Sequence, residues 1–114
     1  MEKPLEITFR GLDPSDAIEN NIRERASKLE RFFSDIMSMQ VVVEAPHKHQ
    51  HKGKHYRVLI DIMVPEKEIV ANRSPDDNAA HEDAYVAIRD AFEAAQRQLE
   101  AYRDRRTGNV KARG

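Results

Sequence analysis

The chain has 114 residues, enough for one domain with a hydrophobic core of its own. It contains no cysteine, which excludes disulfides and thiolate chemistry. A helix that spans a membrane needs about 20 apolar residues, and every apolar run in the sequence is much shorter. The formal net charge is −1, but basic residues gather in 47–57 and again in 101–114, so the remainder is acidic. Such segregation influences the choice of partner more than the total does. We expect a soluble, cytoplasmic protein.

The first elements are a strand and a helix. Residues 5–9 alternate apolar and polar side chains, which is typical of a half-buried strand. Asp13 and Pro14 are typical of a helix start, with Asp13 as the cap and Pro14 in the first turn. Apolar residues then recur every three or four positions and predict a helix over 14–34 with one apolar face.

Three further strands follow. Residues 37–43 and 57–64 alternate again, and the polar segment between them, which contains Gly53, predicts a hairpin with a long basic tip. Pro65, Glu66 and Lys67 predict a tight turn. Residues 68–73 then supply a short fourth strand.

A second amphipathic helix closes the order of elements. Apolar residues at helical spacing predict it from about Ala80 to about Arg106, where Gly108 stops it. We expect a domain over 1–106 and a flexible basic tail over 107–114. The fold class is α+β, in the order β-α-β-β-β-α, with a four-stranded sheet and both helices packed on one face.

Catalysis has no support in the sequence. No Ser–His–acid set or glycine-rich phosphate loop can be assembled, so we expect no enzymatic activity, no cofactor and no small-molecule substrate. His81, Glu82 and Asp83 lie where the second helix begins, and acids there favour the helix dipole, so their role is interpreted as structural.

A histidine cluster lies in the predicted hairpin tip, at His47, His49, His51 and His55. Imidazoles two residues apart on an extended chain face the same way and can hold zinc, nickel or copper. Four fixed cations surround them and no carboxylate lies within the segment. We therefore favour a solvated tip whose histidines gain charge on protonation, with metal binding as the weaker alternative.

Basic and polar residues share one flank of each helix. At about 100° per residue, the flank of the first helix holds Asn21, Arg25, Lys28 and Phe32. The flank of the second helix holds Arg89, Gln96 and Arg103. Together these flanks predict a cationic surface suited to RNA phosphates. The alternative is a salt-bridged exterior, in which Glu24 pairs with Lys28 while Glu93 and Glu100 neutralise the second flank.

A family resemblance favours RNA. His81-Glu-Asp-Ala-Tyr-Val-Ala-Ile88, followed by Gln96-Arg-Gln-Leu99, resembles the second helix of the ribosome hibernation promoting factor family, which includes the ribosome-associated inhibitor protein Y. The segment Ile22-Arg-Glu-Arg-Ala-Ser-Lys-Leu-Glu-Arg-Phe32 is similar to the family's first helix. The similarity covers about residues 5–106, and the chain resembles the short form of the family, without the C-terminal dimerisation domain.

The resemblance implies a translation inhibitor. Family members bind the small ribosomal subunit and its rRNA between head and body, where they overlap the mRNA and tRNA sites in stationary phase or stress. By position, the residues that would inherit the contacts are Arg25, Lys28, Arg31, Arg89, Arg97 and Arg103. The basic segments extend this candidate set with Lys48, Lys52, Lys54, Arg57, Arg105 and Arg106.

Two alternatives and one departure accompany this interpretation. A general double-stranded-RNA-binding module also places two helices on one face of a small sheet, and a histidine-rich metal-binding protein is the weaker alternative. Ala94 and Ala101 stand where many relatives carry lysine, and we expect them to thin the basic surface.

Overall fold

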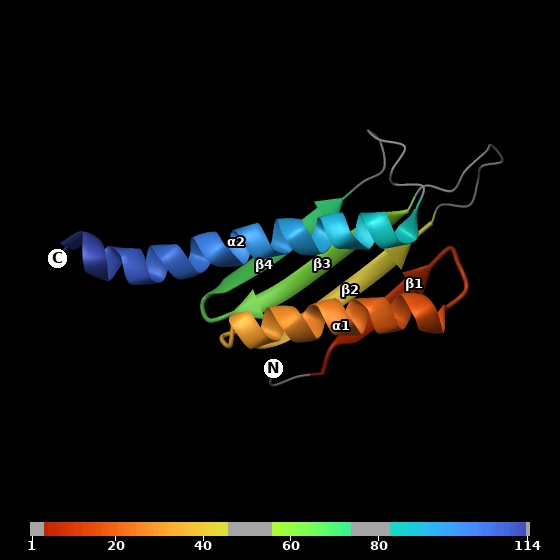
Figure 1. Cartoon of the computed structure of the whole chain (residues 1–114), viewed down its shortest axis with the longest axis horizontal. Helices are drawn as coiled ribbons and strands as arrows, with labels where there is room; N and C mark the ends of the chain where they lie inside the picture. The colour runs from red at the N-terminus through yellow and green to blue at the C-terminus, as the bar shows by residue number, and fades with distance from the viewer. Residues whose placement is uncertain (1–3, 46–55, 74–82, 114) are drawn as a thin grey trace.

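A computed structural model of the chain describes residues 4–45, 56–73 and 83–113, with the backbone alone for Arg73 and 106–113. Figure 1 shows one sheet with two helices lying side by side across it. The elements in chain order are β1 (Glu6–Arg10), α1 (Asp16–Phe32), β2 (Ser38–Glu44), β3 (Arg57–Val64), β4 (Lys67–Arg73) and α2 (Ala84–Arg113).

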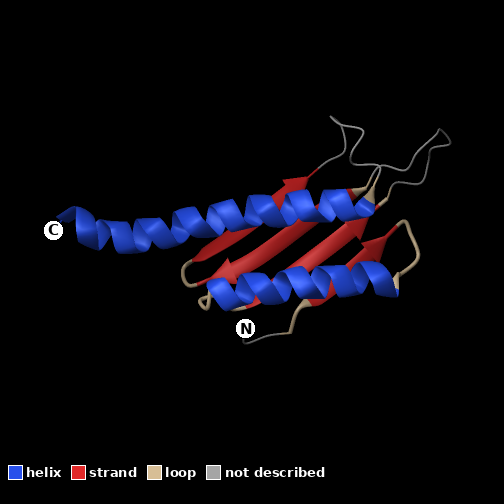
Figure 2. Cartoon of the chain, in the orientation of Figure 1, coloured by secondary structure: helices blue, strands red, loops and turns tan. Residues whose placement is uncertain are grey.

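The four strands form a single sheet in the order β1-β2-β3-β4. β1 runs parallel to β2, because α1 connects them, and the other two pairs are antiparallel. Figure 2 shows both helices on the same side of the sheet. The predicted α+β fold, with its order of elements and both helices on one face, is confirmed.

The core lies between the sheet and the helices. On β2 and β3 every second side chain is fully buried, as at Val41, Val43, Ile60 and Ile62. The residues between them face the opposite side of the sheet, called here the open face. From α1 the core receives Ile18, Ile22, Ala26 and Leu29, and from α2 mainly Ala87, Ile88, Ala91, Ala95 and Leu99.

Ser15 caps α1, and the prediction that Asp13 does so is wrong. The Ser15 backbone is extended, and its hydroxyl accepts a hydrogen bond from the Ile18 backbone N–H at 3.2 Å. A serine in this position satisfies one of the orphan N–H groups of the first turn as well as an aspartate does. The helix consequently begins two residues later than the proline pattern predicts, at Asp16.

Asp83 begins α2, as the structural interpretation of that segment requires. Its carboxylate accepts a hydrogen bond from the Tyr85 backbone N–H at 2.9 Å, and its carbonyl accepts from Ala87. His81 and Glu82 lie outside the described residues.

The predicted end of α2 near Arg106 is wrong, because the helix continues through Gly108 to Arg113. A glycine inside a helix costs only about 1 kcal/mol relative to alanine, and no proline follows to break the backbone pattern. Among the residues of α2 up to Arg105, whose side chains the structure describes, Tyr102 is the last buried one, and its hydroxyl donates to the Pro65 carbonyl at 3.0 Å. Beyond it α2 projects past the β3–β4 turn (Figure 1).

Candidate nucleic-acid interface

The two predicted helix flanks face each other across a groove between α1 and α2. The helices contact each other directly. A cavity of about 130 Å³ lies between them. Its lining from α1 is Arg25, Lys28, Leu29 and Phe32, and from α2 it is Phe92, Glu93 and Gln96. We call this feature the interhelical groove.

On the α1 side, helical spacing places two cations and one aromatic ring along the groove. Leu29 is buried in the core, and Arg25, Lys28 and Phe32 lie beside it on the flank of the helix that reaches the surface. The Arg25 Nε donates to the Asn21 side-chain oxygen at 3.2 Å, which orients the guanidinium. Lys28 is exposed and makes no ion pair with any described residue, so the predicted alternative of a Glu24–Lys28 pair is absent there.

On the α2 side the charges are mixed. Arg89 is exposed and pairs with the neighbouring Asp90 at 3.2 Å instead of with Glu93. The Gln96 side-chain amide donates to Glu100 at 3.1 Å. The carboxylate that lines the groove is that of Glu93. Because these pairs are exposed, each is worth at most about 1 kcal/mol and yields to a phosphate at little cost.

Arg103 closes the groove at the C-terminal end of α1. Its guanidinium lies over the Phe33 ring, 4.6 Å from the ring centroid, and Nη1 donates a long hydrogen bond of 3.5 Å to the Phe32 carbonyl. A second cavity of about 90 Å³ lies here, bounded by Phe32, Phe33, Tyr102 and Arg103 among others. The sequence placed Arg103 on the correct flank, but its contact with Phe33 joins residues 70 positions apart and has no local signal.

The remaining candidate residues lie away from the groove or outside the described residues. Arg31 and Arg97 are exposed and do not line the groove, although each lies one helical turn from a residue that does, Lys28 and Glu93 respectively. Arg57 lies on the open face of the sheet and pairs with Glu44 at 3.5 Å. Arg105 is exposed on the projecting part of α2, and for Arg106 only the backbone is described. The tip candidates Lys48, Lys52 and Lys54 lie outside the described residues.

Ala94 corrects the expected thinning of the basic surface. Its side chain is only 8% exposed and belongs to the core, so this position contributes no cationic surface. Ala101, in contrast, is exposed. The interhelical groove keeps Arg25 and Lys28 irrespective of either alanine.

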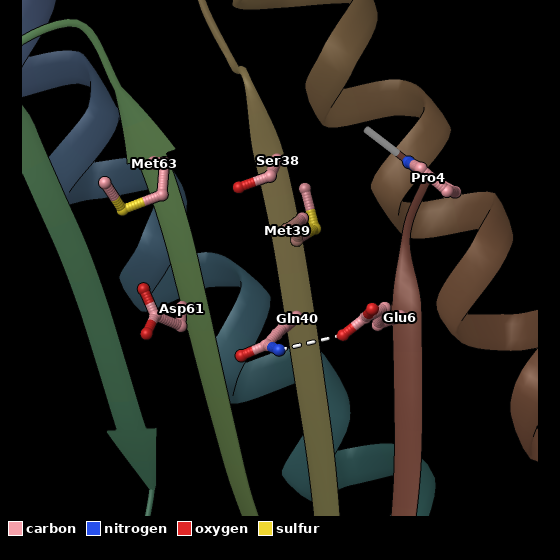
Figure 3. A pocket seen from close by; sticks show the side chains of 7 residues that line it. All are labelled: Pro4, Glu6, Ser38, Met39, Gln40, Asp61 and Met63. Atoms are coloured by element: carbon pink, nitrogen blue, oxygen red, sulfur yellow. Dashed lines mark hydrogen bonds between the residues drawn. The ribbon is translucent and has the colours of Figure 1, made fainter. Parts of the chain in front are cut away.

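The open face carries a different kind of pocket. Its volume is about 360 Å³, and Figure 3 shows Glu6, Gln40 and Asp61 pointing into it from three adjacent strands. The Gln40 amide donates to Glu6 Oε1 at 2.8 Å. Asp61 Oδ1 is buried and accepts no hydrogen bond from a described residue. Two carboxylates make this pocket unsuitable for phosphate.

No group of three or more histidine or acidic side chains that would hold a metal ion occurs among residues 4–45, 56–73 and 83–113. The histidines of the tip, His47, His49, His51 and His55, lie outside these ranges, so their predicted role stays a prediction. In the described part of the chain, no helix is both long enough and apolar enough to cross a membrane.

Comparison with known proteins identifies relatives along almost the whole chain. Residues 5–107 match the family described as "Sigma 54 modulation protein / S30EA ribosomal protein". A ribosome hibernation promoting factor of Azotobacter vinelandii is 31% identical over 101 residues, covering 89% of this chain and 83% of that protein. One from Acinetobacter guillouiae is 32% identical over 105 residues, covering 87% and 88%.

Solved structures share the fold. A ribosomal subunit interface protein from Coxiella burnetii superposes with a TM-score of 0.68 at 16% identity, covering 87% of this chain and 96% of that one. The N-terminal domain of Thermus thermophilus Protein Y gives a TM-score of 0.66 at 19% identity, covering 85% and 94%. With a family match over 5–107 and relatives above 30% identity, the chain belongs to the Sigma 54 modulation protein / S30EA ribosomal protein family, that of the ribosome hibernation promoting factors.

Proposed function

We propose that the chain is a ribosome hibernation factor, a non-enzymatic protein that binds the small ribosomal subunit and its rRNA and thereby inhibits translation. The observation that carries the proposal is the interhelical groove, which is lined by Arg25 and Lys28. On α2, Arg89 lies one turn before the groove residue Glu93, and Arg103 lines the adjoining cavity. The names of its relatives, ribosome hibernation promoting factor and ribosomal subunit interface protein, support the ribosome as the partner.

The groove binds RNA through its rims. Arg25 and Lys28 on one helix and Arg89 and Arg103 on the other contact phosphates, and each neutralised phosphate releases counterions. The two helices run side by side (Figure 1), and helical spacing places these cations along one flank of each helix. Glu6 and Asp61 on the open face repel phosphate, which supports the helix side as the side that meets the rRNA.

The bound protein acts by occupying space. In the channel between head and body it excludes mRNA and tRNA, as the family resemblance implies, and this inhibition operates in stress or stationary phase. Residues 1–106 form the ribosome-binding domain. The projecting part of α2 with Arg105 and Arg106, together with Lys48, Lys52 and Lys54, extends the cationic footprint, whereas Arg57 lies on the open face and is left out of it. The proposal implies a cytoplasmic location, because ribosomes work there.

Sedimentation tests the proposal directly. A stationary-phase lysate is layered on a sucrose gradient at low salt, and the protein is expected in the fractions of the small subunit and of whole ribosomes. Addition of mRNA and initiator tRNA to purified ribosomes should displace it. Absence from every ribosomal fraction would contradict the proposal. Equal affinity for intact ribosomes and for a plain RNA duplex would instead favour the general double-stranded-RNA-binding module.

A further inference from the structure

Phe32 is an exposed aromatic residue at a place where the core is already complete. It is the last residue of α1 and its side chain is 69% exposed. The next residue, Phe33, is 7% exposed and fills the core at this end, together with Ile36 at 2%. Phe32 therefore has no packing role that would explain an aromatic ring at the end of the helix.

The ring stands between two concave surfaces. Phe32 lines the interhelical groove of about 130 Å³ on one side and the cavity of about 90 Å³ beside Tyr102 and Arg103 on the other. Each cavity has room for a planar group that packs against the Phe32 ring. A single exposed apolar residue on a convex surface needs no explanation. The Phe32 ring, in contrast, separates two cavities, one of which is lined by Arg25 and Lys28.

The backbone of Phe32 is in contact with α2. Arg103 donates to the Phe32 carbonyl at 3.5 Å, and the same guanidinium lies over the Phe33 ring. These contacts hold the last turn of α1 against α2, so a ligand that stacks on Phe32 does not have to order this turn.

Cationic side chains line both of the cavities that Phe32 lines. Arg25 and Lys28 lie along the same groove, within two helical turns of the ring, and Arg103 lies at its other side. Aromatic rings flanked by cations bind unpaired nucleotides, because the ring stacks on the base while the cations hold the phosphates. Glu93, across the groove, offers a carboxylate that accepts a hydrogen bond from a base amino group.

We propose that Phe32 is the stacking platform for one unpaired base of the ribosomal RNA, with Arg25, Lys28 and Arg103 holding the adjoining phosphates. The proposal rests on the proposed function and deepens it, because it names the part of the rRNA that the groove takes. A base inside a duplex has both faces covered by its neighbours, so the partner is a base in a loop, a bulge or an extruded position.

A tryptophan placed at position 32 reports on stacking directly. The natural sequence contains no tryptophan, so Phe32→Trp carries the only indole of the chain. A nucleobase stacked on an indole quenches its emission, and we expect titration with purified small subunits to quench the fluorescence of Phe32→Trp. The matched control is Val70→Trp, which puts the indole on the open face at a residue that is 44% exposed. Its emission should stay unchanged.

Affinity measurements separate stacking from charge. Phe32→Leu keeps an apolar side chain but loses the π-face, and it should weaken binding to the small subunit about tenfold. The slope of log affinity against log salt should stay that of the unmodified protein, because the same phosphates are neutralised in both. Phe32→Tyr should restore the affinity. The exposed position allows all three variants to fold, which circular dichroism checks.

The outcomes distinguish this proposal from the proposed function. If the unmodified protein binds the small subunit while Phe32→Leu binds equally well and Phe32→Trp is not quenched, the stacking platform is refuted and the proposed function stands. If the unmodified protein fails to bind ribosomes at all, the proposed function itself fails. If Phe32→Leu changes the oligomeric state of the free protein, Phe32 contacts a second copy of the chain, and the stacking proposal is overturned.

Discussion

The hydroxyl of Tyr102 donates a hydrogen bond to the carbonyl of Pro65 at 3.0 Å and so fastens α2 to the turn between β3 and β4. The ring of Tyr102 is 7% exposed and is the last core contribution from the part of α2, up to Arg105, whose side chains are described. This pair marks the point where α2 leaves the sheet, so it sets the direction in which the basic C-terminal part of the helix projects.

Tyr102→Phe should keep the packing and remove this hydrogen bond. We expect the free energy of unfolding to fall by about 1 kcal/mol, the usual net value of one such bond. Urea denaturation followed by circular dichroism measures the change. Tyr85→Phe is the matched control, because Tyr85 is 41% exposed, and its variant should unfold like the unmodified protein. Equal stability of both variants would mean that water replaces the Tyr102 hydroxyl without loss.

Gly11 is required by two independent features of the loop after β1. Its φ is +76°, and a Cβ added there would lie 2.2 Å from the Ala45 carbonyl oxygen. Gly11→Ala should therefore lower the free energy of unfolding by about 2 kcal/mol or more, since the left-handed conformation alone costs about 1–2 kcal/mol. Gly11→Asn separates the two causes, because asparagine tolerates positive φ but keeps the Cβ. If thermal melting finds Gly11→Asn as stable as the unmodified protein, the close approach to Ala45 is not limiting.

The fold was predictable because periodicity reports directly on burial. Alternation at Met39, Val41 and Val43 and helical spacing from Ile18 to Phe33 each specify one buried face, and those faces meet in the core. The end of α2 was not predictable from local signals, because Gly108 is tolerated inside a helix at modest cost. Two caps were also hard to rank, since Asp13 and Ser15 both suit the position.

The interhelical groove was only half predictable. Helical spacing put Arg25, Lys28 and Phe32 on one flank, but which flank of α2 faces them depends on how the helices pack on the sheet. The contact of Arg103 with Phe33 likewise depends on tertiary structure. Helical spacing did separate Phe32, on the flank, from Phe33, on the apolar face, and the exposures of the two rings agree with that.

Removal of two rim cations should weaken ribosome binding. In Lys28→Ala/Arg89→Ala we expect a lower affinity and a slope of log affinity against log salt that is smaller by about 1 for each phosphate no longer neutralised. Both side chains are exposed, so each change should alter the free energy of unfolding by no more than about 0.5 kcal/mol. Binding measured at several salt concentrations gives both the affinity and the slope.

The control for this double variant removes the same number of cations elsewhere. Arg10 lies on the open face, and Arg23 pairs with Glu19 at 2.9 Å on α1, away from the lining of the groove. Arg10→Ala/Arg23→Ala should leave the salt slope unchanged. Equal decreases in affinity in the two double variants would show that net charge, rather than the interhelical groove, determines binding.

The histidines of the predicted tip provide a pH test. If His47, His49, His51 and His55 approach phosphate, binding takes up protons, and ribosome affinity should rise as the pH falls from about 7.5 to 6, through the usual histidine pKa of about 6.5. Replacement of all four by Gln should abolish this dependence. A metal site predicts the opposite, because protons compete with the metal and a chelator then changes binding. Affinity that is flat with pH in the unmodified protein would exclude both roles.

Glu68 and Asp61 form a carboxyl pair on the open face of β3 and β4. When Glu68 is protonated it donates a hydrogen bond to Asp61, which raises the pKa of Glu68 above its ordinary value, and repulsion between the two carboxylates raises it further. Asp61 lies opposite Val70 and Glu68 opposite Met63 in the register, so the two acids are diagonal neighbours. Glu68 is thus protonated more readily in the folded protein than in the unfolded chain.

Glu68→Gln should remove a pH-dependent contribution to stability. Because the pKa of Glu68 is raised on folding, the shared proton stabilises the protein fully below the pKa of the unfolded chain, and this contribution is lost as the pH rises through the folded value. The amide of Gln donates to Asp61 at every pH and carries no charge. The variant should therefore match the unmodified protein in acid and be the more stable one at pH 7. Urea denaturation of both proteins at a series of pH values measures the difference, in which titrating groups that do not interact with Glu68 cancel. A difference that does not grow with pH would mean that Glu68 and Asp61 are held apart by solvent.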